Sequence, residues 1–168
     1  KDGSLTTNPA IGSDYHYMGS PQPKLLLGWT NDFKYKNWDL NIFIRGVFGN
    51  KIFNATRADL FRPSTAHSAN ILVDVANESP TDLNSYKYSS RFIEDGSYIR
   101  LDNATLGYNF NNLGSYVKSL RIYSSVNNLF VITKYSGIDP DVEQGGIAPG
   151  VDSNTFYPKP RTVFVGLK

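Results

Sequence analysis

The sequence predicts an all-β chain in which antiparallel strands form a sheet with one apolar and one polar face. Its composition favours strands, because 11 Tyr and 10 Phe occur among 168 residues and aromatic residues are enriched in strands. Apolar and polar residues alternate over several segments of about ten residues, and a period of two is typical of half-buried strands. The connections between these segments are alternately short and long.

The first two predicted strands, near residues 24–34 and 38–48, are separated by about three residues, which indicates an antiparallel hairpin. The second of them shows the clearest alternation in the chain. Its polar face carries Asp39, Asn41 and Arg45. Its apolar face carries Trp38, Leu40, Ile42, Ile44 and Phe48.

A third strand is predicted near residues 97–110. It follows a long insertion, residues 49–96, which lacks sustained alternation, and insertions of this length are usually functional or disordered. Strict alternation along the strand places Ile99 and Leu101 on the polar face together with Asn103. The first part of this strand therefore departs from a clean separation of faces.

The fourth and fifth strands are predicted near residues 118–130 and 161–168, and a second long loop, residues 131–160, separates them. This loop is rich in Gly, Asp and Pro. The fourth strand again has two faces. Its polar face carries Arg121, Tyr123, Ser125 and Asn127.

Two architectures explain strands with one apolar face. In an outer-membrane β-barrel the apolar face meets lipid, whereas in a soluble β-sandwich it packs on a second sheet. Periodicity predicts one dry face in both cases. The alternation of short and long connections favours the barrel, which has short turns at one end and long loops at the other. The alternative is a soluble β-sandwich module that binds glycans through aromatic residues in its loops.

The composition argues against several other classes of protein. The chain has no Cys, which rules out disulfides and cysteine metal sites within it. Its net charge is +2, and the basic residues are scattered, so nucleic-acid binding is not expected. The only histidines, His16 and His67, lie in predicted loops, and no phosphate-binding or nucleophile motif occurs. We therefore expect neither an enzyme nor a bound cofactor.

A series of short motifs occurs in order along the last part of the chain. The predicted hairpin contains two further short motifs, Phe33 to Asn37 and Gly46 to Asn50, which belong to the same series. The motifs of the last part are Ser97-Tyr98-Ile99-Arg100, Leu106-Gly107-Tyr108, Asn128-Leu129-Phe130, Thr133-Lys134-Tyr135-Ser136-Gly137-Ile138-Asp139-Pro140 and Tyr157-Pro158-Lys159-Pro160-Arg161-Thr162. In this order they resemble the C-terminal end of SusC/RagA-type TonB-dependent transporters, which are outer-membrane proteins of Bacteroidetes. Each motif is weak alone, but the ordered set is specific.

The resemblance implies that residues 1–168 are the C-terminal segment of a large transmembrane β-barrel. A plug domain and the remaining strands of a barrel of about 22 strands would lie outside this chain. The whole protein is then expected to cross the outer membrane of a Gram-negative bacterium many times and to import oligosaccharides or peptides. The implied partners are the rest of the barrel and its plug, a SusD-like surface lipoprotein, the TonB complex and outer-membrane lipid.

The candidate site residues follow from this arrangement. Polar residues of the strands are expected to face the lumen, where such positions tune selectivity collectively, or simply to hydrogen-bond the plug and water. Aromatic residues of the predicted outer loops could stack on sugar rings or contact the lipoprotein, or instead pack the loops together. The lumen-facing set is Asp39, Asn41, Arg45, Arg121, Tyr123 and Asn127, and the loop aromatics are Tyr15, Tyr17, Tyr135, Phe156 and Tyr157.

Three carboxylates at alternate positions in the second long loop form a weak candidate for a cation site. Oxygen ligands of this kind suit Ca²⁺, but the spacing of a full EF-hand loop is absent. The simpler interpretation is a loop made rigid by Pro140. The three residues are Asp139, Asp141 and Glu143.

Overall fold

The computed structural model describes residues 14–77, 88–111, 113–114, 117–142, 149–153 and 157–168. Its residues group into two compact units. We call residues 24–48, 97–134 and 158–168 the sheet unit, and residues 1–23, 49–96 and 135–157 the loop unit. Each unit is described by itself.

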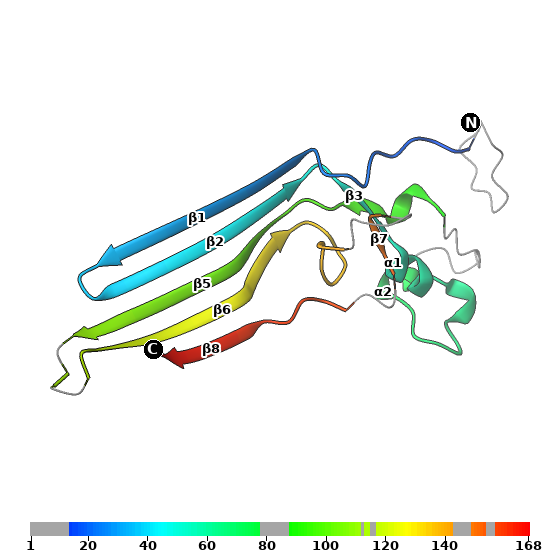
Figure 1. The fold of residues 1–168 in the computed structure, drawn as a ribbon. Coiled ribbons are helices and arrows are strands. Elements are labelled where there is room, and N and C mark those ends of the chain that lie inside the picture. Colours follow the sequence, from blue (N-terminus) through cyan, green and yellow to red (C-terminus); the bar gives the residue numbers. More distant parts are fainter. Residues whose placement is uncertain (1–13, 78–87, 112, 115–116, 143–148, 154–156) are drawn as a thin grey trace. The chain divides into compact units, whose positions relative to one another are not determined.

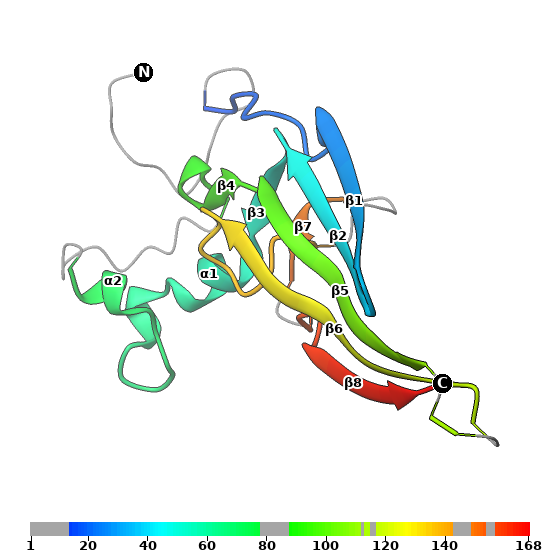
Figure 2. The ribbon, with the colours of Figure 1, turned by 90° about the vertical axis from the view of Figure 1, so that its left-hand side faces the viewer.

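The sheet unit is a five-stranded antiparallel sheet, which confirms the all-β antiparallel prediction. Its strands follow the order β1-β2-β5-β6-β8, and Figure 2 shows them side by side in that order. The sixth strand of the chain, β6, ends at residue 133 rather than near residue 130. The strands are β1 (Leu25–Tyr35), β2 (Trp38–Phe48), β5 (Tyr98–Asn111), β6 (Ser119–Thr133) and β8 (Thr162–Leu167) (Figure 1).

The hairpin of β1 and β2 is paired along its whole length, from Leu25 opposite Phe48 to Tyr35 opposite Trp38. Two residues connect the strands, and the first of them, Lys36, has a φ of 52°. Tight two-residue hairpin turns require such positive φ values because they match the twist of the strands. The alternation of the sequence fixes the register, since a shift by one residue would exchange the two faces.

A register shift in β5 explains why alternation fails there. Ile44 pairs with Leu101 and Phe43 pairs with Asn103, so Asp102 is an extra residue relative to β2. Such a bulge exchanges the faces of the residues that precede it. Ile99 and Leu101 therefore lie on the apolar face, and their predicted position on the polar face was wrong.

The apolar face of the sheet remains open. Fourteen of its large side chains are between 38% and 75% exposed, although a β-sandwich would bury them under a second sheet, whereas Leu101 is 8% exposed. Within the described residues this face is therefore not the interior of a sandwich. The exposed large side chains of this face are Leu25, Leu27, Trp29, Phe33, Tyr35, Trp38, Ile99, Leu106, Ile122, Phe130, Ile132, Val163, Val165 and Leu167.

The loop unit contains a small sheet in the order β4-β3-β7. Strand β3 runs antiparallel to β4 and parallel to β7, so segments from both long loops join in one sheet. The strands are β3 (Lys51–Asn54), β4 (Ile93–Asp95) and β7 (Val151–Asp152). The helical elements are α1 (Ala55–Leu60), α2 (Val73–Ala76) and the 3-10 turns η1 (Pro63–Thr65) and η2 (Ser90–Phe92).

The helix α1 begins where a side chain caps it, because Asn54 Oδ1 accepts a hydrogen bond from the Arg57 backbone N at 2.8 Å. Asn is a preferred residue at this capping position. One side of α1 packs into a core of buried apolar residues. These are Ala58, Phe61, Val75 and Phe92. None of the helices in the described ranges is long and apolar enough to span a membrane.

Candidate functional site

The polar face of the five-stranded sheet brings together the six residues predicted to face a lumen. Residues directly opposite each other on neighbouring strands share a face. Asp39 is opposite Gly107, which is opposite Tyr123, and Arg45 is opposite Arg100. The register places on this one face Asp39, Asn41, Arg45, Arg121, Tyr123 and Asn127.

Near the hairpin end of this face, Asp39 and Arg121 form an ion pair. The Arg121 Nε donates to Asp39 Oδ1 at 3.1 Å, and Arg121 NH2 pairs with Asp39 Oδ2. Asn109 Nδ2 also donates to Asp39 Oδ1, at 3.0 Å. The two charged side chains are each about one quarter exposed. These hydrogen bonds hold the guanidinium and the carboxylate in place. The pair as a whole has no net charge.

Two glycines make room for the large side chains of this cluster. A Cβ atom at Gly107 would lie 2.6 Å from Arg121 NH2 and 2.7 Å from Asp39 Oδ1. A Cβ atom at Gly166 would overlap the ring of Tyr123, which itself lies under the Arg121 guanidinium at 5.0 Å from its ring centroid. Small and large residues therefore alternate across the strands, and the side chains lie flat on the sheet.

A second ion pair lies on β2 and β5. Arg45 Nε donates to Asp102 Oδ2 at 2.7 Å and Arg45 NH2 to Asp102 Oδ1 at 3.3 Å, the paired geometry in which Arg binds carboxylates best. Asp102 is the bulge residue, so the bulge aims its carboxylate at Arg45. Arg100 is 1% exposed and donates to Asn128 Oδ1. The Arg45 and Arg100 guanidinium carbons lie 5.6 and 5.4 Å from the ring centroid of Tyr98.

Between the two ion pairs the face carries uncharged amides and hydroxyls. Asn103 Nδ2 donates to Asn127 Oδ1 at 2.7 Å and to Ser125 Oγ at 3.2 Å. The hydroxyls of Thr105 and Ser125 are 2.8 Å apart. These groups can exchange hydrogen bonds with the hydroxyls of a sugar or the amides of a peptide.

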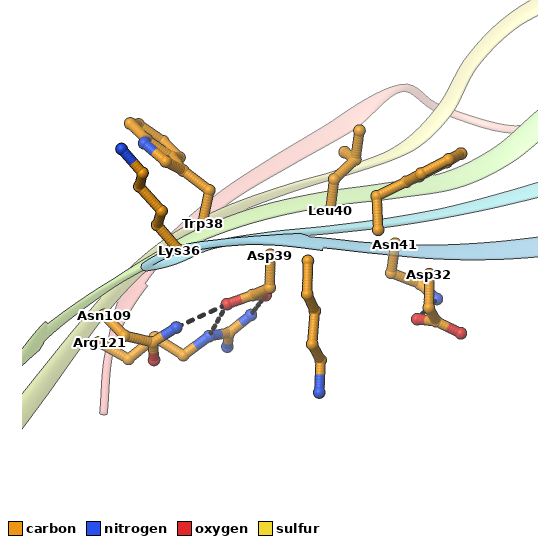
Figure 3. Close-up of a pocket in the computed structure, with 10 residues that line it drawn as sticks. Asp32, Lys36, Trp38, Asp39, Leu40, Asn41, Asn109 and Arg121 are labelled. Carbon is orange, nitrogen blue, oxygen red and sulfur yellow. Dashed lines mark hydrogen bonds and ion pairs between the residues drawn. The ribbon is translucent and has the colours of Figure 1, made fainter.

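A pocket of about 370 Å³ lies at the hairpin end of β1 and β2. Figure 3 shows Asp39, Asn109 and Arg121 on one side of the sheet and Trp38 and Leu40 on the other. The polar side also includes Asp32 and Asn41, and Asn41 Nδ2 donates to Asp32 Oδ1 at 2.7 Å. Since these polar groups already pair with one another, the pocket presents a polar surface with little net charge.

The loop unit has a polar network centred on Glu94. Its carboxylate accepts hydrogen bonds from the Ser136 backbone N at 2.8 Å and the Ser136 hydroxyl at 2.7 Å. Asn54 Nδ2 donates to the same carboxylate at 3.2 Å, and Arg57 NH1 lies 3.5 Å from it. The network joins the two long loops through side chains that are far apart in the sequence.

The predicted loop aromatics divide into exposed and buried residues. Tyr15, Tyr17 and Tyr157 are 60%, 86% and 83% exposed. Tyr135 is 5% exposed, packs with Ile52 and Val142, and donates to Asp152 Oδ2 at 2.5 Å. Because the ring of Tyr135 has almost no free surface, its burial favours the second of the two interpretations of the loop aromatics, packing of the loops. Phe156 lies outside the described residues.

The carboxylates proposed for a cation are not gathered as ligands in the part that the structure describes. Asp139 is 4% exposed, and its Oδ1 accepts a hydrogen bond from the Asp141 backbone N at 2.9 Å, which is an ordinary turn contact. Glu143 lies outside the described residues. In the described ranges no group of three or more His, Cys, Asp or Glu could hold a metal ion.

Comparison with known proteins places this geometry in context. No family model matches the sequence. A TonB-dependent receptor of Formosa agariphila is 33% identical over 92% of this chain and 17% of that protein. The TonB-dependent receptor SusC of Bacteroides thetaiotaomicron is 33% identical over 93% of this chain and 16% of that protein. The chain is homologous to a segment of TonB-dependent receptors such as SusC. It spans less than one fifth of the length of these relatives.

The fold of this chain is also similar to solved structures. The RagAB peptide importer in its closed-closed state has a TM-score of 0.79 and 20% identity over 96% of this chain and 19% of that chain. The same importer in its open-open state has a TM-score of 0.72. The fold of the chain therefore recurs in these solved structures.

Sequence reasoning missed several residues that complete the polar face of the sheet. Asp102 is the bulge residue and Arg100 precedes it, and strict alternation assigns both to the wrong face. Asn103, Thr105 and Asn109 were recognised as polar positions but not as partners of the predicted set. Their pairing depends on which strands are neighbours, and only the observed order of β2, β5 and β6 supplies that information.

Proposed function

We propose that this chain forms the C-terminal part of the barrel wall of an outer-membrane active importer. The proposed protein takes up oligosaccharides or peptides together with a SusD-like surface lipoprotein and is driven by TonB. The observation that carries the proposal is the two-faced sheet: a wide, open apolar face on one side and a hydrogen-bonded polar face on the other. Homology to TonB-dependent receptors supports the same conclusion.

The height of the apolar face fits a membrane. The 11 residues of β1 span ten steps, or about 33 Å at about 3.3 Å per residue. At the strand tilt of about 35–45° found in outer-membrane barrels, this length covers about 25 Å of membrane, which is the usual height of the apolar band. The apolar face of β1 thus supplies one complete crossing.

An aromatic cluster lies at the hairpin end of the same face. The ring centroids of Trp38 and Tyr108 are 4.7 Å apart, and those of Tyr108 and Phe110 are 4.6 Å apart. Tyr35 is opposite Trp38. Aromatic girdles of this kind lie at both interfaces of outer-membrane barrels, so the cluster supports placing the short turns at one membrane surface.

The polar face suits a transported solute that is polar and nearly uncharged. Its Asp–Arg pairs are neutral in sum, and its central amides and hydroxyls can hydrogen-bond in either direction. In the proposed importer this face lines the lumen, beside a plug that this chain does not contain. The exposed Tyr15, Tyr17 and Tyr157 would contact the surface lipoprotein, and energy from TonB would reach the plug.

Membrane fractionation of the intact, full-length protein tests the proposal. We expect the protein in the outer membrane, extracted only with detergent, and with a folded form that migrates differently from its boiled form in gel electrophoresis. A full-length protein that is soluble without detergent would contradict the proposal.

Replacement of the three exposed tyrosines tests the lipoprotein contact. The triple variant Tyr15→Ala, Tyr17→Ala and Tyr157→Ala should lower the amount of lipoprotein that copurifies with the tagged importer. Tyr88→Ala is the matched control, because Tyr88 is 83% exposed in the same loop unit but is not one of the predicted contacts. If the triple variant copurifies with as much lipoprotein as the wild type, the three tyrosines do not form the contact.

A further inference from the structure

The apolar face of the sheet contains a groove near its aromatic cluster. The groove has a volume of about 620 Å³. Ser124 lies between Leu106 and Val165 in one row across β5, β6 and β8, and its small side chain leaves the row hollow. Trp38 and Tyr108 line the groove at its hairpin end. The groove is therefore mostly apolar, lies across several strands and is open to the outside of the face.

A positive charge lies beside the aromatic end of the groove. Lys36 and Trp38 project to the same side of the sheet (Figure 3). The Lys36 Nζ lies 5.4 Å from the centroid of the Tyr35 ring, and among the described residues no carboxylate forms an ion pair with it. By contrast, Asp39 is on the opposite face and is paired with Arg121.

We propose that an anionic phospholipid binds at this site, with an acyl chain in the groove over Ser124 and its phosphate beside Lys36. The inference rests on the proposed membrane position of the sheet. Aromatic side chains lie at the level of the lipid headgroups, so a groove that begins at Trp38 and continues along the apolar face starts at headgroup level and runs into the acyl region. Lysines near helix or strand ends extend to the same level.

The charges around the groove indicate an anionic lipid. A lysine near the membrane surface attracts an anionic lipid by an amount equivalent to about fivefold in binding. Lys34, two residues earlier, lies on the polar face opposite Asp39 and therefore does not share the site. The site thus combines the ammonium group of Lys36 with an apolar groove, which suits the phosphate and chain of phosphatidylglycerol.

Native mass spectrometry of the intact, detergent-purified importer with added phosphatidylglycerol or phosphatidylethanolamine tests this site. We expect the wild type to retain phosphatidylglycerol preferentially. Lys36→Gln should weaken its retention about fivefold, and Ser124→Leu, which fills the groove, should weaken it at least as much. Lys34→Gln and Ala104→Leu are the matched controls, because Lys34 is on the polar face and Ala104 is a small residue of the apolar face outside the groove.

The outcomes separate this inference from the proposed function. If the protein is in the outer membrane but Lys36→Gln and Ser124→Leu retain phosphatidylglycerol like the wild type, the lipid site is wrong and the importer proposal is unaffected. If the full-length protein is not in the membrane, both proposals are wrong. Lys36 lies in an exposed turn, so its variant tests the site even where Ser124→Leu disturbs folding.

Discussion

The phenol of Tyr135 is held inside the loop unit by a carboxylate. Its hydroxyl donates to Asp152, which is 5% exposed and also lies 3.4 Å from the Thr56 hydroxyl. Tyr135→Phe would leave Asp152 with one donor fewer in a buried place, and such losses cost about 1–3 kcal/mol. We expect faster hydrogen exchange in residues 51–54 and 149–153 of the intact protein. Tyr157→Phe, at an exposed position, is the control, and equal effects of the two variants would contradict the assignment.

The same side chain predicts a dependence of stability on pH. Burial, together with the hydrogen bond to Asp152, raises the pKa of Tyr135 above its usual value of 10.0. The folded state therefore keeps a proton that the unfolded state releases at high pH. This contribution to stability is fully present below about pH 10 and decreases as the pH rises further. Urea unfolding at pH 9 and pH 11 should show a smaller loss in Tyr135→Phe than in the wild type.

At the scale of single residues, sequence patterns identify chemical types but not partners. The polar positions Asp39 and Arg121 were predicted on one face, and the register brings them together. Tyr135 was a candidate contact residue because it lies in a long loop, and packing of the loops was the alternative. Its burial depends on Ile52 and Val142, which come from segments that only the fold of the loop unit places beside it.

At the scale of elements, Glu94 connects the two long loops. Glu94→Gln would replace one acceptor oxygen by an NH₂ group that faces donors of Ser136, Asn54 or Arg57, so about 1–3 kcal/mol of local stability should be lost. Hydrogen exchange of the intact protein should show the loss in both long loops. Asp74→Asn is the control, because Asp74 is 63% exposed and lies 3.5 Å from Arg57. A loss confined to one loop would contradict the connecting role.

The bulge at Asp102 determines on which face of the sheet the preceding side chains of β5 lie. Deleting residue 102 would move Ile99 and Leu101 to the polar face and Arg100 to the apolar face, because the side-chain period of a strand is two. We expect the deletion to reduce strongly the amount of folded protein, measured by heat-modified gel migration. Asp102→Asn keeps the backbone register and should fold. Normal folding of the deletion variant would mean that the bulge is dispensable.

The strands could be predicted from the sequence because alternation is a local pattern. Lys24 to Phe48 alternate well enough to indicate both strands and their hairpin. The bulge could not be predicted, since an extra residue leaves a sequence that looks only irregular around Ile99. The small sheet of β3, β4 and β7 was also missed, because strands of two to four residues are too short for a period to show.

At the scale of the whole molecule, the two faces of the sheet should meet different surroundings in the membrane. The chain has no Cys, so single cysteines can be introduced into it, in a full-length protein in which any Cys outside this chain is replaced by Ser. Cysteines at Leu106 and Val165 on the apolar face should resist a charged, water-soluble maleimide, whereas one at Ser125 on the polar face should react through the lumen. When the protein is unfolded in urea without detergent, all three cysteines should react equally, which shows that the maleimide can modify each of them. Equal labelling of both faces in intact outer membranes would show that lipid does not cover the apolar face, and the barrel-wall interpretation of the sheet would then be wrong.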